Sequence, residues 1–230
     1  MGQRERQTRP AKPANVVSIA DLFEGLESPT GHVLYPLYGN GHTGIEYVTR
    51  QTPAERLVVT FSDYGSLNIH APGYAEAFLL KRGFDVLMLK CNINNWFQDL
   101  SREQLQETFA QLPAYQDVLT YGSNMGGYAA MYFADAVGAR AAIAMSPQIS
   151  VDPEIVPFDP RWSGDGARIE FQHEPLAKVL HETNAVHYVL FDPKNPDKLH
   201  VEMMLAASDH VLPLPLPYTG QPVGVALPEM

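Results

Sequence analysis

The chain has 230 residues, 45% of them hydrophobic, which is enough for one domain with a sizeable core. Its formal net charge is −10, from 16 basic and 26 acidic residues, and this argues against nucleic acid or an anionic membrane as the main partner. The single cysteine, Cys91, excludes an internal disulfide and favours a reducing compartment, so we expect a cytoplasmic protein.

The first residues are expected to lie outside the folded part of the chain. Residues 1–14 carry four basic side chains against one acidic side chain, and no apolar segment follows, so they are not a secretory signal. We expect residues 1–15 to form a flexible arm and residues 16–230 to form a single domain. No apolar run reaches the ~20 residues needed to cross a bilayer.

The secondary structure begins with a helical pattern at residues 16–26. Two strand-like segments follow, at 33–38 and 45–50, and their turn sequence predicts an antiparallel hairpin at a sheet edge, where Pro36 is tolerable. From residue 56 onward, apolar strands alternate with amphipathic helices. Strands are expected at 56–61, 84–90, 117–121, 141–145, 187–191 and 211–216, and helices at 73–81, 101–112, 128–137, 174–182 and 200–207.

This alternation predicts an α/β fold, a three-layer α/β/α sandwich with a mainly parallel sheet and an antiparallel edge hairpin. Residues 146–166 interrupt the pattern with four prolines and two glycines, and long excursions of this kind are usually functional. Ligands of such sheets bind outside the carboxyl ends of the strands, where polar loops follow Phe61, Tyr121 and Phe191.

The most informative motif is Gly-Ser-Asn-Met-Gly-Gly at residues 122–127. A short β-branched strand precedes it and an alanine-rich helix follows, which is the setting of a nucleophile elbow. Glycines suit such a tight strand-to-helix turn because a Cβ would clash there. The apex, where an elbow presents a serine, holds Asn124.

Together with a Thr-Phe-Ser-Asp loop at 60–63 and Asp-Pro-x-x-x-Asp at 192–197, the elbow resembles the α/β-hydrolase superfamily. It is most similar to small bacterial hydrolase-like proteins whose elbow reads Tyr-Gly-Ser-Ser-Met-Gly-Gly-Tyr. The resemblance covers residues 33–227. It implies a three-layer fold and a site with a nucleophile, a histidine base, an orienting acid and backbone N–H groups for an oxyanion.

Carried onto this chain, the resemblance puts Asn124 at the nucleophile position and Gln221 at the base position, where relatives are expected to show Gly-His. The acid position falls on Asp197 or Asp192, and Asp197 is preferred because it lies deeper in the turn. A carboxamide has no proton to give up near neutral pH, and glutamine cannot serve as a general base. Two catalytic positions are therefore substituted.

The resemblance implies an oxyanion hole from the N–H groups of Met125 and of Ser62 or Asp63. Tyr64 in the same loop is equally compatible with cleft lining and with turn formation. Ser123 beside the apex is read as a structural hydroxyl rather than a replacement nucleophile, because its side chain leaves the strand end in another direction. No cofactor is expected, and the histidines show no metal-ligand spacing, so no metal is expected either.

These residues predict a pseudo-hydrolase that binds a small molecule or a protein partner in a residual cleft. The alternative is an active hydrolase or acyltransferase, acting on an ester-type substrate through Asp63, or through His200 and Asp197, which are three residues apart. Asn124 could also deamidate to an aspartate nucleophile. A third possibility is a structural subunit, such as a homo-oligomer, that uses the hairpin or the excursion as an interface.

Overall fold

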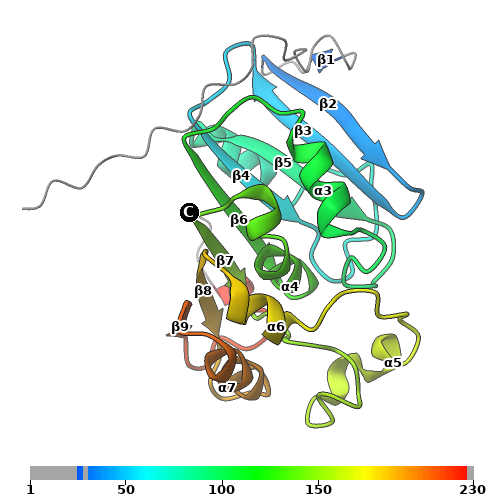
Figure 1. Cartoon of the computed structure of the whole chain (residues 1–230), viewed down its shortest axis with the longest axis vertical. Coiled ribbons are helices and arrows are strands. Elements are labelled where there is room, and N and C mark those ends of the chain that lie inside the picture. The colour runs from blue at the N-terminus through cyan, green and yellow to red at the C-terminus, as the bar shows by residue number, and fades with distance from the viewer. Residues whose placement is uncertain (1–24, 28–30, 227–230) are drawn as a thin grey trace, which may run out of the picture.

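The computed structural model of the chain describes residues 25–27 and 31–226 (Figure 1). Their centre is a nine-stranded sheet in the order β1-β2-β3-β5-β4-β6-β7-β8-β9. In chain order the strands are β1 (Leu26–Glu27), β2 (His32–Gly39), β3 (Thr43–Arg50), β4 (Arg56–Phe61), β5 (Asp85–Cys91), β6 (Asp117–Ser123), β7 (Ala141–Met145), β8 (Val186–Phe191) and β9 (Val211–Pro215).

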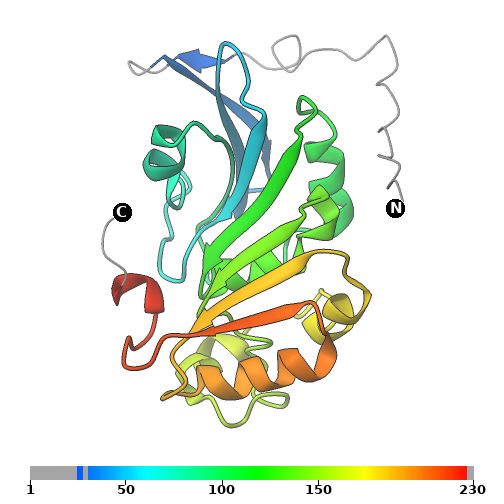
Figure 2. The same ribbon diagram turned by 90° about the vertical axis from the view of Figure 1, so that its left-hand side faces the viewer.

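Helices cover both faces of the sheet, which confirms the predicted three layers. Figure 2 shows α2 and η3 on one side and α3, α4, α6 and α7 on the other. The α-helices are α2 (Glu76–Lys81), α3 (Arg102–Phe109), α4 (Met125–Tyr132), α5 (Ser163–Gly166), α6 (Leu176–Glu182) and α7 (Asp197–Ala207). Short 3-10 helices are η1 (Asp135–Val137), η2 (Pro160–Trp162) and η3 (Val223–Ala226).

Strand direction divides the sheet into two parts. The neighbours β2 and β3, and β3 and β5, are antiparallel, whereas all pairs from β5 to β9 are parallel. The predicted hairpin is therefore confirmed, and β1 extends its edge by a short antiparallel pairing with β2. Every residue of β5 is buried, as expected for a strand covered on both faces.

Several element boundaries differ from the sequence prediction. The segment 16–26 lies outside the described residues except at its end, where Leu26 begins β1 instead of closing a helix. The helix expected from residue 73 begins at Glu76, because Ala75 before it has a left-handed backbone with φ 55°. The helix expected from residue 200 begins at Asp197, whose backbone N–H donates to Asn195 Oδ1 over 2.8 Å.

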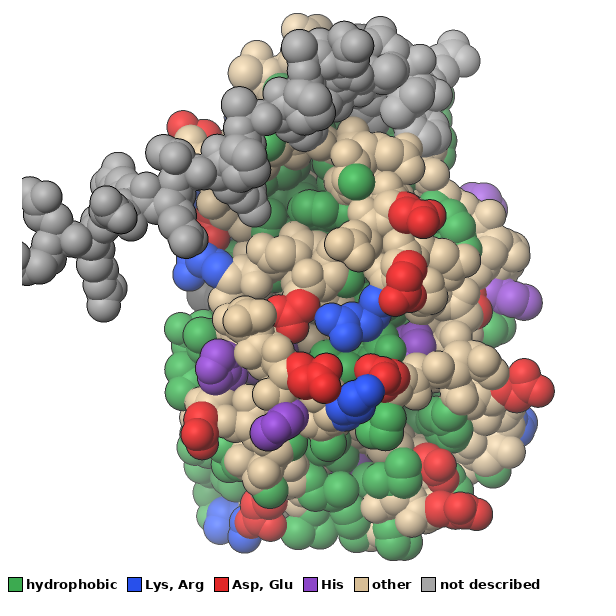
Figure 3. Space-filling view, viewed as in Figure 1, with side chains coloured by type: hydrophobic (Ala, Val, Ile, Leu, Met, Phe, Trp, Pro, Cys, Tyr) green, Lys and Arg blue, Asp and Glu red, His purple; other side chains and the backbone are tan. Residues whose placement is uncertain are grey.

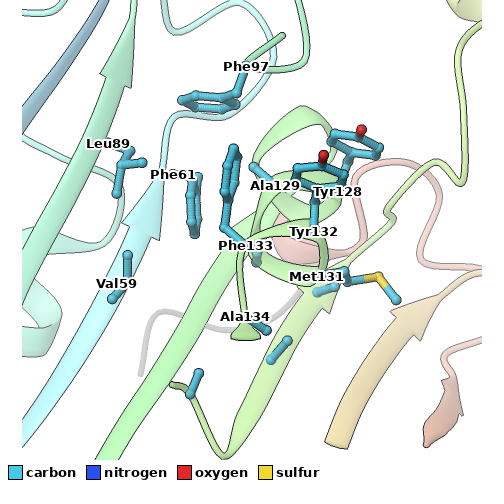
Figure 4. Packing of buried hydrophobic residues seen from close by; sticks show 14 of the residues in the cluster. Val59, Phe61, Leu89, Phe97, Tyr128, Ala129, Met131, Tyr132, Phe133 and Ala134 are labelled. Atoms are coloured by element: carbon cyan, nitrogen blue, oxygen red, sulfur yellow. The ribbon is translucent and has the colours of Figure 1, made fainter. Parts of the chain in front are cut away.

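Helix α4 forms the centre of the larger core. All eight of its residues are buried, and it packs against β4, β6 and β7. Figure 4 shows aromatic rings filling the space beside it, where Phe61 lies edge-on to Phe97 and stacks on Phe133, at centroid distances of 5.6 and 5.9 Å. Dense burial on every side fixes the start of α4, and with it the β6–α4 turn.

The last strand, β9, ends the sheet at the edge opposite β1. Its prolines Pro213 and Pro215 lie beside Val189 and Phe191 of β8. Beyond the strand, the backbone N–H of Leu216 still donates to Phe191 O over 2.8 Å. The predicted proline-containing strand is confirmed.

Candidate functional site

The β6–α4 turn holds Asn124 in a backbone conformation that L-residues rarely adopt, with φ 49° and ψ −116°. Its backbone groups are fixed on both sides, since its N–H donates to Met145 O over 2.9 Å and its C=O accepts from Tyr128 N–H over 3.0 Å. Strain of about 1–3 kcal/mol at such a residue persists only where the surroundings over-determine it, and it concentrates at functional sites.

Glycines make this turn possible by allowing close backbone approach. A Cβ on Gly122 would lie 2.1 Å from Gly126 O, and a Cβ on Gly126 would lie 2.6 Å from Phe61 O. Both neighbours are backbone atoms, so neither contact could be relieved by a side-chain movement. The turn therefore requires both glycines and sets Asn124 against the end of β4.

The Asn124 carboxamide is held by hydrogen bonds from two loops. Its Nδ2 donates to Asp63 Oδ1 over 2.8 Å, and its Oδ1 accepts from Gln221 Nε2. The orientation of the amide follows from its neighbours, because a carboxylate only accepts and so must face the Asn124 NH₂ group. Asp63, Asn124 and Gln221 thus form one hydrogen-bonded chain across the carboxyl end of the sheet.

The loop that carries Gln221 is anchored by Asp192, at the end of β8. One carboxylate oxygen of Asp192 accepts from the N–H of Gly220 over 2.8 Å, and the other accepts from the N–H of Lys194 over 2.9 Å. Burial acts to raise the pKa of Asp192, but these backbone donors outweigh it and hold the pKa below its ordinary value. Asp192 is therefore an ionised anchor for the residue beside Gln221.

Asp63 is the ionisable side chain that contacts Asn124. Burial raises the pKa of the Asp63 carboxyl above its ordinary value, and the hydrogen bonds from Asn124 and from the Tyr64 N–H offset this only in part. A carboxylate in this position brings negative charge to the end of β4, close to the start of α4.

Comparison with solved structures identifies the frame in which this site lies. The capsule O-acetyltransferase of Neisseria meningitidis serogroup A is 12% identical, covers 90% of this chain and 95% of its own, and superposes with a TM-score of 0.59. The chain has the α/β-hydrolase fold. An acetyl xylan esterase from a Thermoanaerobacterium species (16% identical, 89% and 85% covered, TM-score 0.56) and one from Paenibacillus sp. R4 (10%, 89% and 85%, 0.60) share it. No protein-family model and no curated protein matches the sequence.

One of the N–H groups predicted to form the oxyanion hole is already used within the sheet, and two are not. The N–H of Ser62 donates to Leu89 O over 2.9 Å, so it is committed to the sheet and is not a donor to a ligand. Met125 is the first residue of α4, and the first N–H groups of a helix have no intrahelical acceptor. Met125 and Asp63 therefore remain as the candidate backbone donors.

Tyr64, which was also predicted to line the cleft, contacts the excursion instead. Tyr64 Oη donates to Asp165 Oδ2 over 2.8 Å, and its ring packs edge-on to Trp162 at a centroid distance of 4.6 Å. It thereby holds the excursion against the loop after β4. Ser123, at the end of β6, is buried.

The structure does not bring Asp197 and His200 to Asn124. Asp197 Oδ1 instead accepts from Arg161 Nη2 over 2.7 Å, and the guanidinium also contacts Asp159. Of the two carboxylates in the Asp-Pro-x-x-x-Asp motif, it is Asp192 that contacts the Gln221 loop. Asp197, the first residue of α7, faces the excursion through this contact with Arg161.

His200 is fully buried and belongs to the same ionic cluster. Its Nδ1 accepts from the N–H of Ile149 over 3.3 Å, so the proton of the neutral ring is on Nε2, which donates to Asp159 Oδ2 over 2.9 Å. Burial acts to raise the pKa of Asp159, but hydrogen bonds from Arg161 and His200 outweigh it and hold the pKa well below its ordinary value. The cluster fastens the excursion to α7.

Asp159 and Arg161 are the residues that sequence reasoning missed. They lie in an irregular segment, and their partners on α7 are 36 and 41 positions away along the chain. Within residues 25–27 and 31–226, no group of three or more His, Cys, Asp or Glu side chains is arranged to hold a metal ion. None of the helices described there is long and apolar enough to span a bilayer.

Proposed function

We propose that this α/β-hydrolase-fold protein binds a ligand at the elbow without serine–histidine catalysis. The observation that carries the proposal is the hydrogen-bonded chain of Asp63, Asn124 and Gln221. Two of its three members are carboxamides. Neither gains or loses a proton near neutral pH, so the pair cannot generate a nucleophile as a serine and a histidine do.

Asp63 supports the same proposal through its charge. Catalysis of acyl transfer depends on donors aimed at the oxygen that becomes negative in the transition state. A carboxylate within hydrogen-bond distance of the Asn124 amide, in the loop expected to supply one of those donors, opposes a second negative charge. Ground-state binding of a neutral group is not penalised in this way.

The ligand that suits the site is a small neutral group with a carbonyl or hydroxyl oxygen. The N–H of Met125 offers a donor, and the amide of Gln221 offers both a donor and an acceptor once its contact with Asn124 is exchanged. Acetyl-transferring and acetyl-cleaving proteins share the fold. An acetylated or hydroxylated compound is therefore the first ligand class to screen.

A restoration experiment tests the proposal. The wild type should show no labelling by a fluorophosphonate and no hydrolysis of p-nitrophenyl acetate beyond a buffer control. The double variant Asn124→Ser with Gln221→His should be labelled at position 124 and should hydrolyse the ester, because Asp192 already anchors the loop that would carry the base. Adding Asp192→Asn should abolish most of that gain.

Two outcomes would contradict the proposal. The first is covalent labelling or esterase activity in the wild type that survives purification to homogeneity. The second is an intact-protein mass one unit above that expected for asparagine, located at position 124, which would show deamidation. The structure disfavours the deamidated form, since a carboxylate there would face Asp63 across the present 2.8 Å contact.

A second candidate function rests on Asp63 alone. Of the three residues considered for displaced chemistry, Asp63 lies within hydrogen-bond reach of Asn124, whereas Asp197 and His200 contact the excursion. A carboxyl with a raised pKa could act as a general base toward a water molecule. Any wild-type hydrolysis that Asp63→Asn abolishes and Asp197→Asn leaves intact would favour this function.

A further inference from the structure

A cavity lies away from the carboxamide of Asn124, between the excursion, α4, α6 and α7. Its volume is about 190 Å³, and its lining is mainly apolar: Trp96, Tyr128, Ile149, Val151, Leu176 and Met203. Neither Asn124 nor the two side chains hydrogen-bonded to its carboxamide, Asp63 and Gln221, line this cavity. We propose that it binds the hydrocarbon part of an uncharged ligand, as a chain or ring of about six carbon atoms.

The polar groups in the cavity wall already have partners in the protein. The His173 Nε2–H donates to Leu100 O over 2.9 Å, and its Nδ1 accepts from Gln98 Nε2 and Tyr128 Oη, each over 3.1 Å. Gln98 Oε1 accepts the backbone N–H groups of Gln172 and His173. Because this network is complete without a ligand, the wall offers a guest apolar contact instead of hydrogen bonds.

The size and the apolar lining of the cavity determine the class of ligand. An apolar cavity of about 150 Å³ in another protein stays empty of water and takes up benzene, so a cavity of this volume accommodates about six carbon atoms. Burial of each additional methylene strengthens binding until the cavity is full. The guest is therefore a short alkyl chain or a single ring.

Charge at the mouth restricts the guest further. Asp152 and Glu174 are the carboxylates in the lining; Lys178 beside the cavity pairs with Glu174 over 2.5 Å, and no Lys or Arg side chain lines the cavity itself in the described part of the chain. A carboxylate on the ligand would meet the like charge of Asp152. Ile155 and Phe171 extend the apolar lining outward and are 48% and 39% exposed. Figure 3 shows hydrophobic side chains reaching the surface over the lower half of this face, where Figure 1 places α6 and α7.

The cavity contains its own reporter. The chain has two tryptophans. Trp96 lines the cavity, and the Trp162 ring packs against the Trp96 ring at a centroid distance of 5.8 Å. In a Trp162→Phe background, Trp96 fluorescence is titrated with 1-hexanol, 1-butanol and sodium hexanoate. We expect saturable changes with 1-hexanol, binding roughly tenfold weaker for 1-butanol because two methylenes are missing, and weaker binding of hexanoate than of 1-hexanol.

Filling variants decide whether the signal comes from this cavity. Ala177→Phe and Ile155→Phe both add bulk to its lining, and either should weaken 1-hexanol binding at least tenfold. Ala206→Phe, the same enlargement at an exposed position of α7 outside the lining, should leave binding unchanged. Circular dichroism checks that each variant is folded. A non-saturable wild-type titration, or unchanged affinity in the folded filling variants, overturns the proposal.

Discussion

The close approach of Gly126 to the end of β4 makes a sharp prediction for Gly126→Ala. The added Cβ would lie 2.6 Å from Phe61 O and 2.8 Å from Ser62 O. Ordinary van der Waals contact begins at 3.4 Å, which is 0.8 and 0.6 Å farther than these two distances, so α4 and the end of β4 must move apart. Overpacking of this kind costs about 1–3 kcal/mol, and the better helix propensity of alanine returns up to about 1 kcal/mol. We expect a net loss of about 2 kcal/mol, because both neighbours are backbone.

Urea unfolding followed by circular dichroism measures this loss, and a matched substitution controls for it. Gly164→Ala is also a helical glycine-to-alanine change, but its Cβ would meet only Arg168 Nη2, at 3.6 Å. It should leave the free energy of unfolding unchanged or raise it by up to about 1 kcal/mol. If the free energy of unfolding of Gly126→Ala lies within about 0.5 kcal/mol of the wild-type value, the close approach of Gly126 to β4 does not hold the turn.

Three further predictions concern buried charge. Arg161→Met leaves two buried aspartates without their cation and should destabilise by about 3 kcal/mol in urea unfolding, whereas Arg140→Met, at an exposed ion pair, should cost less than about 1 kcal/mol. Burial lowers the pKa of His187 to about 4, so the unfolded chain takes up this proton at a higher pH than the folded one; stability should fall by roughly 3 kcal/mol from pH 6.5 to pH 4, and His187→Phe should remove that component. Burial raises the pKa of Asp63, so the pH dependence is the reverse of that for His187. The folded chain holds the Asp63 proton at a higher pH than the unfolded chain, and the stability that this gives is lost as pH rises through the folded pKa. Asp63→Asn should therefore stabilise the protein at pH 7. Equal pH profiles for the variants and the wild type would contradict the last two.

The strands of the sheet could be predicted because a strand that is buried on both faces appears in the sequence as a short run of mainly apolar residues. The strands at 56–61 and 141–145 are continuous apolar runs with polar flanks, and β4 and β7 have those limits. The helix after the glycine-containing turn was predicted to begin at Tyr128, whereas α4 begins at Met125. Gly126 and Gly127 have poor helix propensity, and it is packing against β4 and β7 that makes them helical.

The residue pattern at 122–127 located the β6–α4 turn, but it could not predict which side chains surround that turn. The motif at 122–127 marks a turn whose geometry is local, so the sequence predicts it directly. The choice between Asp192 and Asp197 depends on which one faces the last loop and which one faces the excursion. That depends on Arg161, which meets Asp197 from an irregular segment with no periodic pattern. Long-range pairing of this kind leaves no mark in a single sequence.

The prolines of β9 determine what can happen at that edge of the sheet. In a strand, alternate residues point their N–H groups to alternate sides, and His210 and Leu216 make backbone hydrogen bonds to β8. Residues 211, 213 and 215 therefore face outward. The N–H of Val211 donates to Ser208 O, and Pro213 and Pro215 have none to offer. A strand from another molecule would find no donors to pair with, so the edge is protected against strand addition and the aggregation that follows from it, even though Leu212 and Leu214 are exposed there.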